Sequence, residues 1–252
     1  MGAQFPFLDH DGVLAFAHRG GAGDWPENTM PAFAGAVELG YRYVETDAHV
    51  TADGVLLAFH DDRLNRVTDG HGVIADLSYR EVQRAKVDGR EPIPLLADLL
   101  GTWPDLRVNI DPKHDRCLDA LVTVIEQTGA IDRVCCGSFS DHRLHVLRSR
   151  LGPRLCTPLG PRGTARLRAA CFGVPAGTLN APCAQVPTEV KGRRLVDERF
   201  VHTAHRLGVQ VHVWTIDDPA EMADLCDLGV DGIMTDRPAL LKEVLVRRGR
   251  WT

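Results

Sequence analysis

Apolar residues are grouped along the chain in short runs, and most runs are followed by a longer stretch with helical periodicity. Short β-rich runs that alternate with helical stretches are typical of β-strand and α-helix units around a parallel sheet. The runs that predict strands are 13–19, 43–50, 55–61, 108–113, 134–140, 154–160, 184–187, 209–217 and 230–236. The stretches that predict helices are 31–40, 94–100, 117–129, 141–152, 219–229 and 237–249.

Glycines follow several apolar-periodic stretches. A glycine in a left-handed backbone conformation commonly ends a helix. We therefore expect such glycines at Gly40, Gly129, Gly152, Gly208 and Gly229.

The second and third runs predict a hairpin. Residues 43–50 and 55–61 are separated only by Thr51 to Gly54, which is too short for a parallel crossover. Asp53 followed by Gly54 is a hairpin signal. If the turn is centred on this pair, residue 50 faces residue 57 and Asp47 faces His60. The hairpin accounts for one of the nine runs, which leaves eight for a barrel.

The length of 252 residues is typical of one eight-stranded α/β barrel. We predict a single domain over residues 1–252, a (β/α)8 TIM barrel with a short excursion after the third strand. The excursion, at about 62–92, is polar and contains a short helical piece. We expect it to lie over the active-site face without a separate core, because loops on that face carry function.

Composition and charge restrict the class of protein. Hydrophobic residues make up 44% and charged residues 25%, as in a soluble globular chain. The net charge of -5 and a pI near 6.1 argue against nucleic-acid partners. The N-terminal residues lack the features of a signal peptide, and no segment approaches the roughly 18 apolar residues of a membrane span. We expect a cytoplasmic protein without a transmembrane segment, and the sequence leaves its oligomeric state open.

The cysteines predict neither a disulfide framework nor a zinc site, because they are odd in number and form no C-x-x-C pair. We expect reduced, buried residues that fill the core as small apolar groups. They are Cys117, Cys135, Cys136, Cys156, Cys171, Cys183 and Cys226.

Carboxylates are concentrated at predicted strand ends. Glu45 and Asp47 are two residues apart on a strand, so both side chains point to one face, and two such charges inside a barrel need a cation. Asp111 and Lys113 repeat the spacing. Asp111 can supply a third oxygen ligand to Mg2+ or Ca2+, while Lys113 can face an anionic substrate. His49 lies on the face of Glu45 and Asp47 by parity, within reach of the metal's outer shell.

Two histidines end apolar strands. His18 follows residues 13–17 and precedes Arg19 and two glycines, which let a ligand approach closely. His60 follows residues 55–59 and precedes Asp61. Two histidines beside an acidic cluster indicate acid/base chemistry.

Six segments in this order resemble the glycerophosphodiester phosphodiesterase family: AHRGGAGDWPENTMPAF, YVETDAHVTADGVLLAFHDDRLNRVTDGHG, VNIDPK, GSFS, VHVWTID and GVDGIMTDRP. The resemblance covers nearly the whole chain. It implies that His18 and His60 form an acid/base pair and that Arg19 binds phosphate. It also implies metal ligands at Glu45, Asp47 and Asp111, where the family usually has Glu at the third position, and an aromatic wall for glycerol at Trp214.

Two further motifs of the family match this chain. Glu27, Asn28 and Thr29 match its E-N-T element, for which a helix start and a direct role in the site remain equally open. For Asp236 and Arg237 in the last motif we favour a structural role.

The resemblance implies hydrolysis of small glycerophosphodiesters to sn-glycerol 3-phosphate and an alcohol, and dependence on a divalent metal, Mg2+ or Ca2+. We favour His60 as the base and His18 as the acid, and the attacking group is water or the substrate's own glycerol hydroxyl. The head-group preference stays open.

Two other functions remain as alternatives. A lysophospholipase D-like or sphingomyelinase D-like lipid phosphodiesterase needs an exposed apolar rim, of which the residues after His60 show little sign. An inactive barrel that binds a phosphate-bearing ligand should have lost a histidine or an acid, and all are present.

Overall fold

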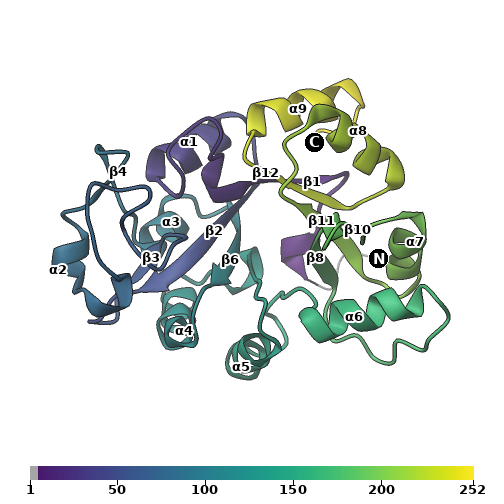
Figure 1. The fold of residues 1–252 in the computed structure, drawn as a ribbon, viewed down its shortest axis with the longest axis horizontal. Helices are drawn as coiled ribbons and strands as arrows, with labels where there is room; N and C mark the ends of the chain where they lie inside the picture. The colour runs from purple at the N-terminus through teal and green to yellow at the C-terminus, as the bar shows by residue number, and fades with distance from the viewer. Residues whose placement is uncertain (1–4) are drawn as a thin grey trace.

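The computed structural model describes residues 5–252 as a curled parallel sheet surrounded by helices (Figure 1). Seven strands follow one another in the order β7-β6-β2-β1-β12-β11-β8, and every neighbouring pair is parallel. Their bounds are β1 Leu14–Ala17, β2 Tyr43–Val50, β6 Arg107–Pro112, β7 Val134–Cys136, β8 Cys183–Pro187, β11 Gln210–Trp214 and β12 Gly232–Thr235.

The segment 155–159 takes the eighth position and joins the two ends of this sheet. Cys156 forms an isolated parallel β-bridge with Cys135 of β7, and Pro158 forms another with Cys183 of β8. The amide of Cys136 donates to the carbonyl of Cys156 over 3.0 Å, and the amide of Leu159 donates to the carbonyl of Cys183 over 2.7 Å. The predicted (β/α)8 barrel is therefore confirmed, with its seam between β7 and β8 held by isolated bridges.

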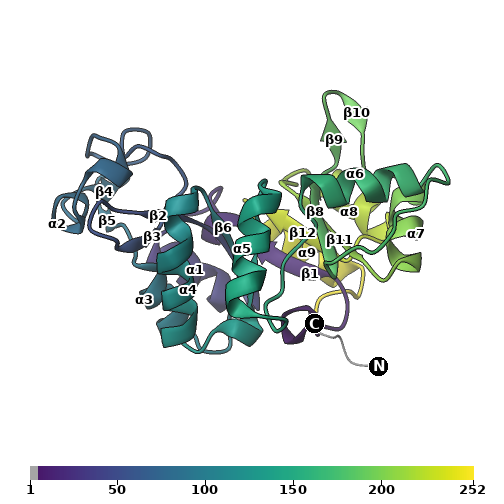
Figure 2. The ribbon, with the colours of Figure 1, turned by 90° about the horizontal axis from the view of Figure 1, so that it is seen from below.

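Helices cover the outside of the barrel, as Figures 1 and 2 show from two directions. They are α1 Met30–Glu38, α3 Leu96–Thr102, α4 Leu118–Gln127, α5 Asp141–Leu151, α6 Pro161–Ala170, α7 Glu198–Arg206, α8 Pro219–Leu228 and α9 Pro238–Arg247. All five predicted glycines have positive φ, between 61° and 90°. The helix α6 has no counterpart among the predicted elements, because polar residues dominate it and Leu167 alone is buried on it. Of α7 only the end was predicted, at Gly208.

A short 3-10 helix, η1 (Pro6–Leu8), lies against residues at the N-terminal ends of the strands. The hydroxyl of Tyr43 donates to the carbonyl of Phe7 over 2.9 Å. Phe7 and Leu8 pack in one buried cluster with Phe16 and Tyr43. This end of the barrel is thus filled by apolar side chains, which leaves the opposite end for a site.

The predicted hairpin exists, but its register is one residue away from the prediction. Strand β3 (Leu56–Ala58) pairs antiparallel with β2, and residue 50 faces residue 56. The loop has three residues, because Thr51 and Val55 form two hydrogen bonds: the amide of Thr51 donates to the carbonyl of Val55, and the amide of Val55 donates to the Thr51 hydroxyl, each over 3.0 Å. Phe59 therefore faces Asp47 and donates its amide to the Asp47 carbonyl, so the predicted pairing of His60 with Asp47 was wrong.

The excursion after β3 contains four short elements: η3 Ile74–Asp76, α2 Tyr79–Val82, β4 Lys86–Val87 and β5 Glu91–Pro92. Contrary to expectation, it has an apolar core of its own. That cluster comprises Leu57, Phe59, Leu64, Ile74, Val82, Ala85, Val87 and Ile93. The prediction failed because these residues are scattered among polar ones, and β3 adds Leu57 to them.

Among residues 5–252, no helix is both long enough and apolar enough to cross a membrane.

Candidate active site

A cavity of about 670 Å³ opens at the C-terminal ends of the strands, where barrel enzymes hold their active sites. Every predicted site residue lines it: His18, Arg19, Glu45, Asp47, His60, Asp111, Lys113 and Trp214. These side chains come from the ends of β1, β2, β6 and β11 and from the residues after β3. The fold therefore brings together residues that are up to 196 positions apart in the sequence.

The acidic side chains form one cluster with the positively charged side chains of Lys113 and Arg19. Asp47 faces Asp111 across the β2–β6 pair. The Nζ of Lys113 lies 2.6 Å from Oδ1 of Asp47 and 2.9 Å from Oδ2 of Asp111. The Nε of Arg19 lies 3.3 Å from Oδ2 of Asp47. Asp47 is thus the most closely compensated acid, whereas Glu45 has no lysine or arginine side chain within 4 Å in the described structure.

The pKa values of the acids follow this compensation. Burial, with the charge of Asp47 added, raises the pKa of Glu45 to about 7. Burial also opposes ionisation of Asp47, but Lys113 and Arg19 outweigh it and lower the pKa of that carboxyl. Burial raises the pKa of Asp111 because Lys113 offsets it only in part. Like charges that share a buried site resist ionisation together, so the cluster favours a further cation.

His18 is held in a tight turn at the end of β1. It starts the 3-10 helix η2 (His18–Gly20), in which Arg19 has a φ of 50°. The Nδ1 of His18 lies 2.6 Å from Oδ1 of Asp236, and its Nε2 lies 3.6 Å from Oε2 of Glu45. Burial opposes protonation of His18, but the carboxylates of Glu45 and Asp236 outweigh it and raise its pKa. The Asp236 contact fixes Nδ1 as the protonated nitrogen and directs Nε2 towards the acids.

His60 has a similar arrangement with a more exposed ring. Its Nδ1 lies 2.6 Å from Oδ1 of Asp61, and 33% of its side chain is exposed. Arg66 donates from Nε to Oδ2 of Asp61 over 2.6 Å and also binds both oxygens of Glu27. Hydrogen bonds from Arg66, joined by one from His60, lower the pKa of Asp61 to about 2. Asp61 therefore stays ionised and holds the ring of His60.

The E-N-T element lies at the start of α1, beside the cavity. Thr29 accepts the amide of Ala32 and caps α1. Asn28, which is buried with a φ of 54°, donates to Oδ2 of Asp47 over 3.3 Å. Glu27 accepts from Nη1 of Arg19 over 3.1 Å. The element thus starts a helix and contacts two residues of the cavity.

Three contacts were absent from the sequence predictions. Asp236, for which a structural role was favoured, contacts His18, and Arg66 contacts Asp61. His49 binds the carbonyl of His60 through Nε2 over 2.9 Å, which anchors the chain at His60 and does not bring His49 to the acids. A useful signal was available for Asp61, which directly follows His60, but none marked the distant partners.

The donor set fits a hard cation. Glu45, Asp47 and Asp111 offer only oxygen, which is the ligand type that Mg2+ and Ca2+ prefer. The unbalanced charge at Glu45 gives such an ion a physical reason to bind. That these three residues are metal ligands stays a prediction.

The other wall of the cavity is apolar, a feature that the sequence did not reveal. Phe139 is 71% exposed and stacks edge-on against Trp214, with ring centroids 5.7 Å apart. The wall is completed by Pro158, Leu159, Pro161, Ala165, Val186, Pro187, Val190 and Leu195. Val190 belongs to a hairpin of β9 (Glu189–Val190) and β10 (Arg193–Arg194), which projects from the barrel beside α6 (Figure 2). No residue of 62–92 lines this cavity.

Comparisons with known proteins agree with this site. The model of the "Glycerophosphoryl diester phosphodiesterase family" matches residues 18–240. The chain therefore belongs to the glycerophosphoryl diester phosphodiesterase family, and it is a phosphoric diester hydrolase. It is 39% identical over 254 residues to "Probable glycerophosphodiester phosphodiesterase 2" of Mycobacterium tuberculosis, covering 97% of this chain and 95% of that one.

Two further relatives extend the comparison. The chain is 30% identical over 272 residues to "Lysophospholipase D GDPD1" of Mus musculus, covering 91% of this chain and 85% of that one. A crystal structure from Silicibacter pomeroyi, which carries the same family name, superimposes with a TM-score of 0.84 at 25% identity and covers 98% of this chain and 100% of that one.

Proposed function

We propose that this chain hydrolyses glycerophosphodiesters to sn-glycerol 3-phosphate and an alcohol by means of His18 and His60. The observation that carries this proposal is the pair of histidines in one cavity, each with Nδ1 2.6 Å from a carboxylate oxygen. A ring held in this way presents Nε2 for proton transfer. Arg19 and Lys113 line the same cavity and supply positive charge for a phosphodiester.

The two rings differ in the charged groups around them. Glu45 and Asp236 favour the protonated form of His18, which suits the acid that protonates the leaving alcohol. His60 is paired with one carboxylate whose charge is shared with Arg66, and we assign to it the removal of a proton from the attacking oxygen. In this assignment Nε2 of His60 takes the proton of the attacking oxygen, and Nε2 of His18 gives a proton to the oxygen of the leaving alcohol.

A divalent cation, Mg2+ or Ca2+, would be held by Glu45, Asp47 and Asp111. Such an ion would supply positive charge for the phosphate group. Lys113 already contacts two of these acids, so it would share them with the cation and remain beside the phosphate. Asn28 would keep the carboxylate of Asp47 in place.

A second candidate substrate is a lysophospholipid. The apolar wall around Phe139 and Trp214 was not evident from the sequence, and it supplies the apolar rim that an acyl chain needs. The resemblance to a mouse protein named lysophospholipase D agrees with such a substrate. The chemistry at the phosphate would be the same, and only the group bound along the apolar wall would differ.

A role in the cytoplasm stays a prediction from the sequence.

The test compares glycerophosphocholine with a lysophosphatidylcholine below its critical micelle concentration. The purified chain is treated with EDTA and then supplied with Mg2+ or Ca2+, and kcat/KM is measured for both substrates. We expect loss of turnover in EDTA and recovery with one of the two ions. A higher kcat/KM for the lysolipid would assign the apolar wall to an acyl chain. No turnover of either substrate by the folded, metal-supplied protein would contradict the proposal.

A further inference from the structure

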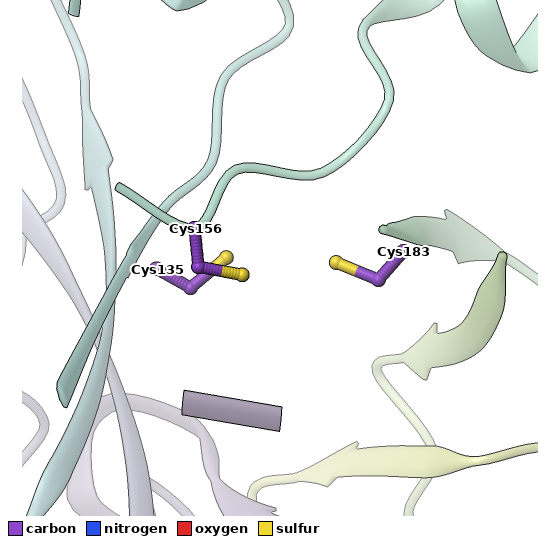
Figure 3. A group of neighbouring side chains, drawn as sticks. All are labelled: Cys135, Cys156 and Cys183. Carbon is purple, nitrogen blue, oxygen red and sulfur yellow. The ribbon is translucent and has the colours of Figure 1, made fainter. Parts of the chain in front are cut away.

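Three cysteines from different strand positions meet inside the barrel. Figure 3 shows the side chains of Cys135, Cys156 and Cys183 pointing towards one another. Their sulfur atoms all lie within 4.8 Å of each other, and each residue is at most 1% exposed. They belong to β7, to the segment 155–159 and to β8, so they surround the seam at which the barrel closes.

The sulfur atoms lie just beneath the floor of the cavity. Alternate residues of a strand point to the same side. Each cysteine comes two positions before a residue that lines the cavity, namely Gly137, Pro158 and Gln185. The Nε2 of Gln185 lies 4.0 Å from the sulfur of Cys135. Gln185 therefore contacts both the cavity and the cysteine cluster.

The neighbouring Cys136 shows how specific this grouping is. It is also fully buried, but it packs in the apolar cluster between barrel and helices, whereas the three cysteines share the interior cluster with Phe16 and Tyr43. Burial alone, as expected for core cysteines, is thus common to both groups. Convergence of sulfur atoms distinguishes the three.

We propose that Cys135, Cys156 and Cys183 bind a thiophilic divalent cation of the Zn2+ class at the barrel seam, separate from the oxygen ligands above. Thiolates select such ions over Mg2+ and Ca2+. A cation about 2.3 Å from each of three sulfurs holds them roughly 4 Å apart, so small side-chain rotations form the site.

Charge in the surroundings supports this assignment. Three thiolates with a divalent cation have a net charge of −1, which is costly in an apolar interior unless it is compensated. The guanidinium of Arg148 binds the same segment, donating to Oγ1 of Thr157 over 2.7 Å and to the carbonyl of Pro158 over 3.0 Å.

Binding of the cation would stabilise the closed barrel. β7 and β8 are joined through the segment 155–159 by isolated bridges, and a cation bound to all three cysteines would tie these strand positions together. Because ligands that bind only the folded state stabilise it, the cation should raise the melting temperature.

The experiment titrates Cd2+, a spectroscopic probe for Zn2+, into the reduced full chain in the presence of saturating Mg2+. The ultraviolet absorption band of thiolate-bound cadmium should grow to one equivalent, and the melting temperature should rise. Imidazole and carboxylate ligands, such as the separate cluster of His49, Asp62 and His114, give no such band. Absence of a stoichiometric band in wild type would overturn the proposal.

Variants locate the bound ion. Cys183→Ser and Cys156→Ser should each weaken Cd2+ binding at least tenfold, while the matched control Cys136→Ser should bind as wild type does. Equal weakening in Cys136→Ser, or unchanged binding in both ligand variants, would overturn the assignment. If a serine variant does not fold, Cys183→Ala takes its place. The cadmium NMR shift of the wild-type complex is then measured as well, because it reports the number of sulfur ligands.

Discussion

His18 and Asp236 connect the end of the first barrel strand with the end of the last, through a contact of 2.6 Å between Nδ1 and Oδ1. The two residues are 218 positions apart, so the contact exists only when β1 and β12 pair. It holds the proton of His18 on Nδ1 and leaves Nε2 beside Glu45. Folding and the proposed acid/base chemistry are thus linked through one carboxylate.

The first prediction concerns this carboxylate. Asp236→Asn should lower kcat on the order of 10²-fold or more with a small change in KM, because an amide permits the wrong tautomer of His18. The loss of charge should also lower the pKa of His18, which Glu45 and Asp236 together raise. The alkaline limb of the pH profile of kcat should therefore move to lower pH. An exposed control, Asp227→Asn, should leave both quantities unchanged, and an unshifted profile in Asp236→Asn would count against the positioning role.

The second prediction concerns the stability of the metal-free protein. The pKa of Glu45 is raised from an ordinary value of 4.5 to about 7, so between these pH values the folded state binds more protons than the unfolded state. The free energy of unfolding should therefore fall as pH rises from about 4.5 to about 7, by up to about 3 kcal/mol from this group.

Glu45→Gln should remove most of that pH dependence in EDTA and raise stability at pH 8, while weakening stabilisation by Mg2+ or Ca2+. Urea unfolding at several pH values measures the effect, with the exposed Glu126→Gln as control. The same slope in wild type and Glu45→Gln would show that Glu45 does not carry the buried charge.

The third prediction tests the apolar wall. Phe139→Ser should raise KM for a lysolipid several-fold by removing buried contact, and it should change KM for glycerophosphocholine little. Phe172 is a matched control because it is 65% exposed and lies outside the cavity wall. Equal effects of the two substitutions on lysolipid KM would show that the wall does not bind the acyl chain.

Much of the fold and site could be predicted because the relevant signals are local. Strand parity placed Glu45 with Asp47 and Asp111 with Lys113, and strand ends marked His18 and His60; all of them line one cavity. The hairpin of β2 and β3 was also visible. Its register was not, because the choice of a three-residue loop depends on the side chain of Thr51.

The remaining features depend on tertiary structure. Asp236 reaches His18 only through the pairing of β1 with β12, and Cys135, Cys156 and Cys183 meet only because the seam brings three strand positions together. No spacing in the sequence reports such contacts. The apolar wall is likewise assembled from separate segments, which include β8, β9, α6 and the loops after β7 and before α6.

The most direct test of the central claim is glycerol 3-phosphate release from glycerophosphocholine by wild type, His18→Ala and His60→Ala, each supplied with the activating ion. Both substitutions should lower kcat on the order of 10²-fold or more, as expected for loss of an acid or a base. The exposed His145→Ala on α5 should match wild type. A folded His18→Ala or His60→Ala variant with wild-type kcat would contradict the two-histidine mechanism.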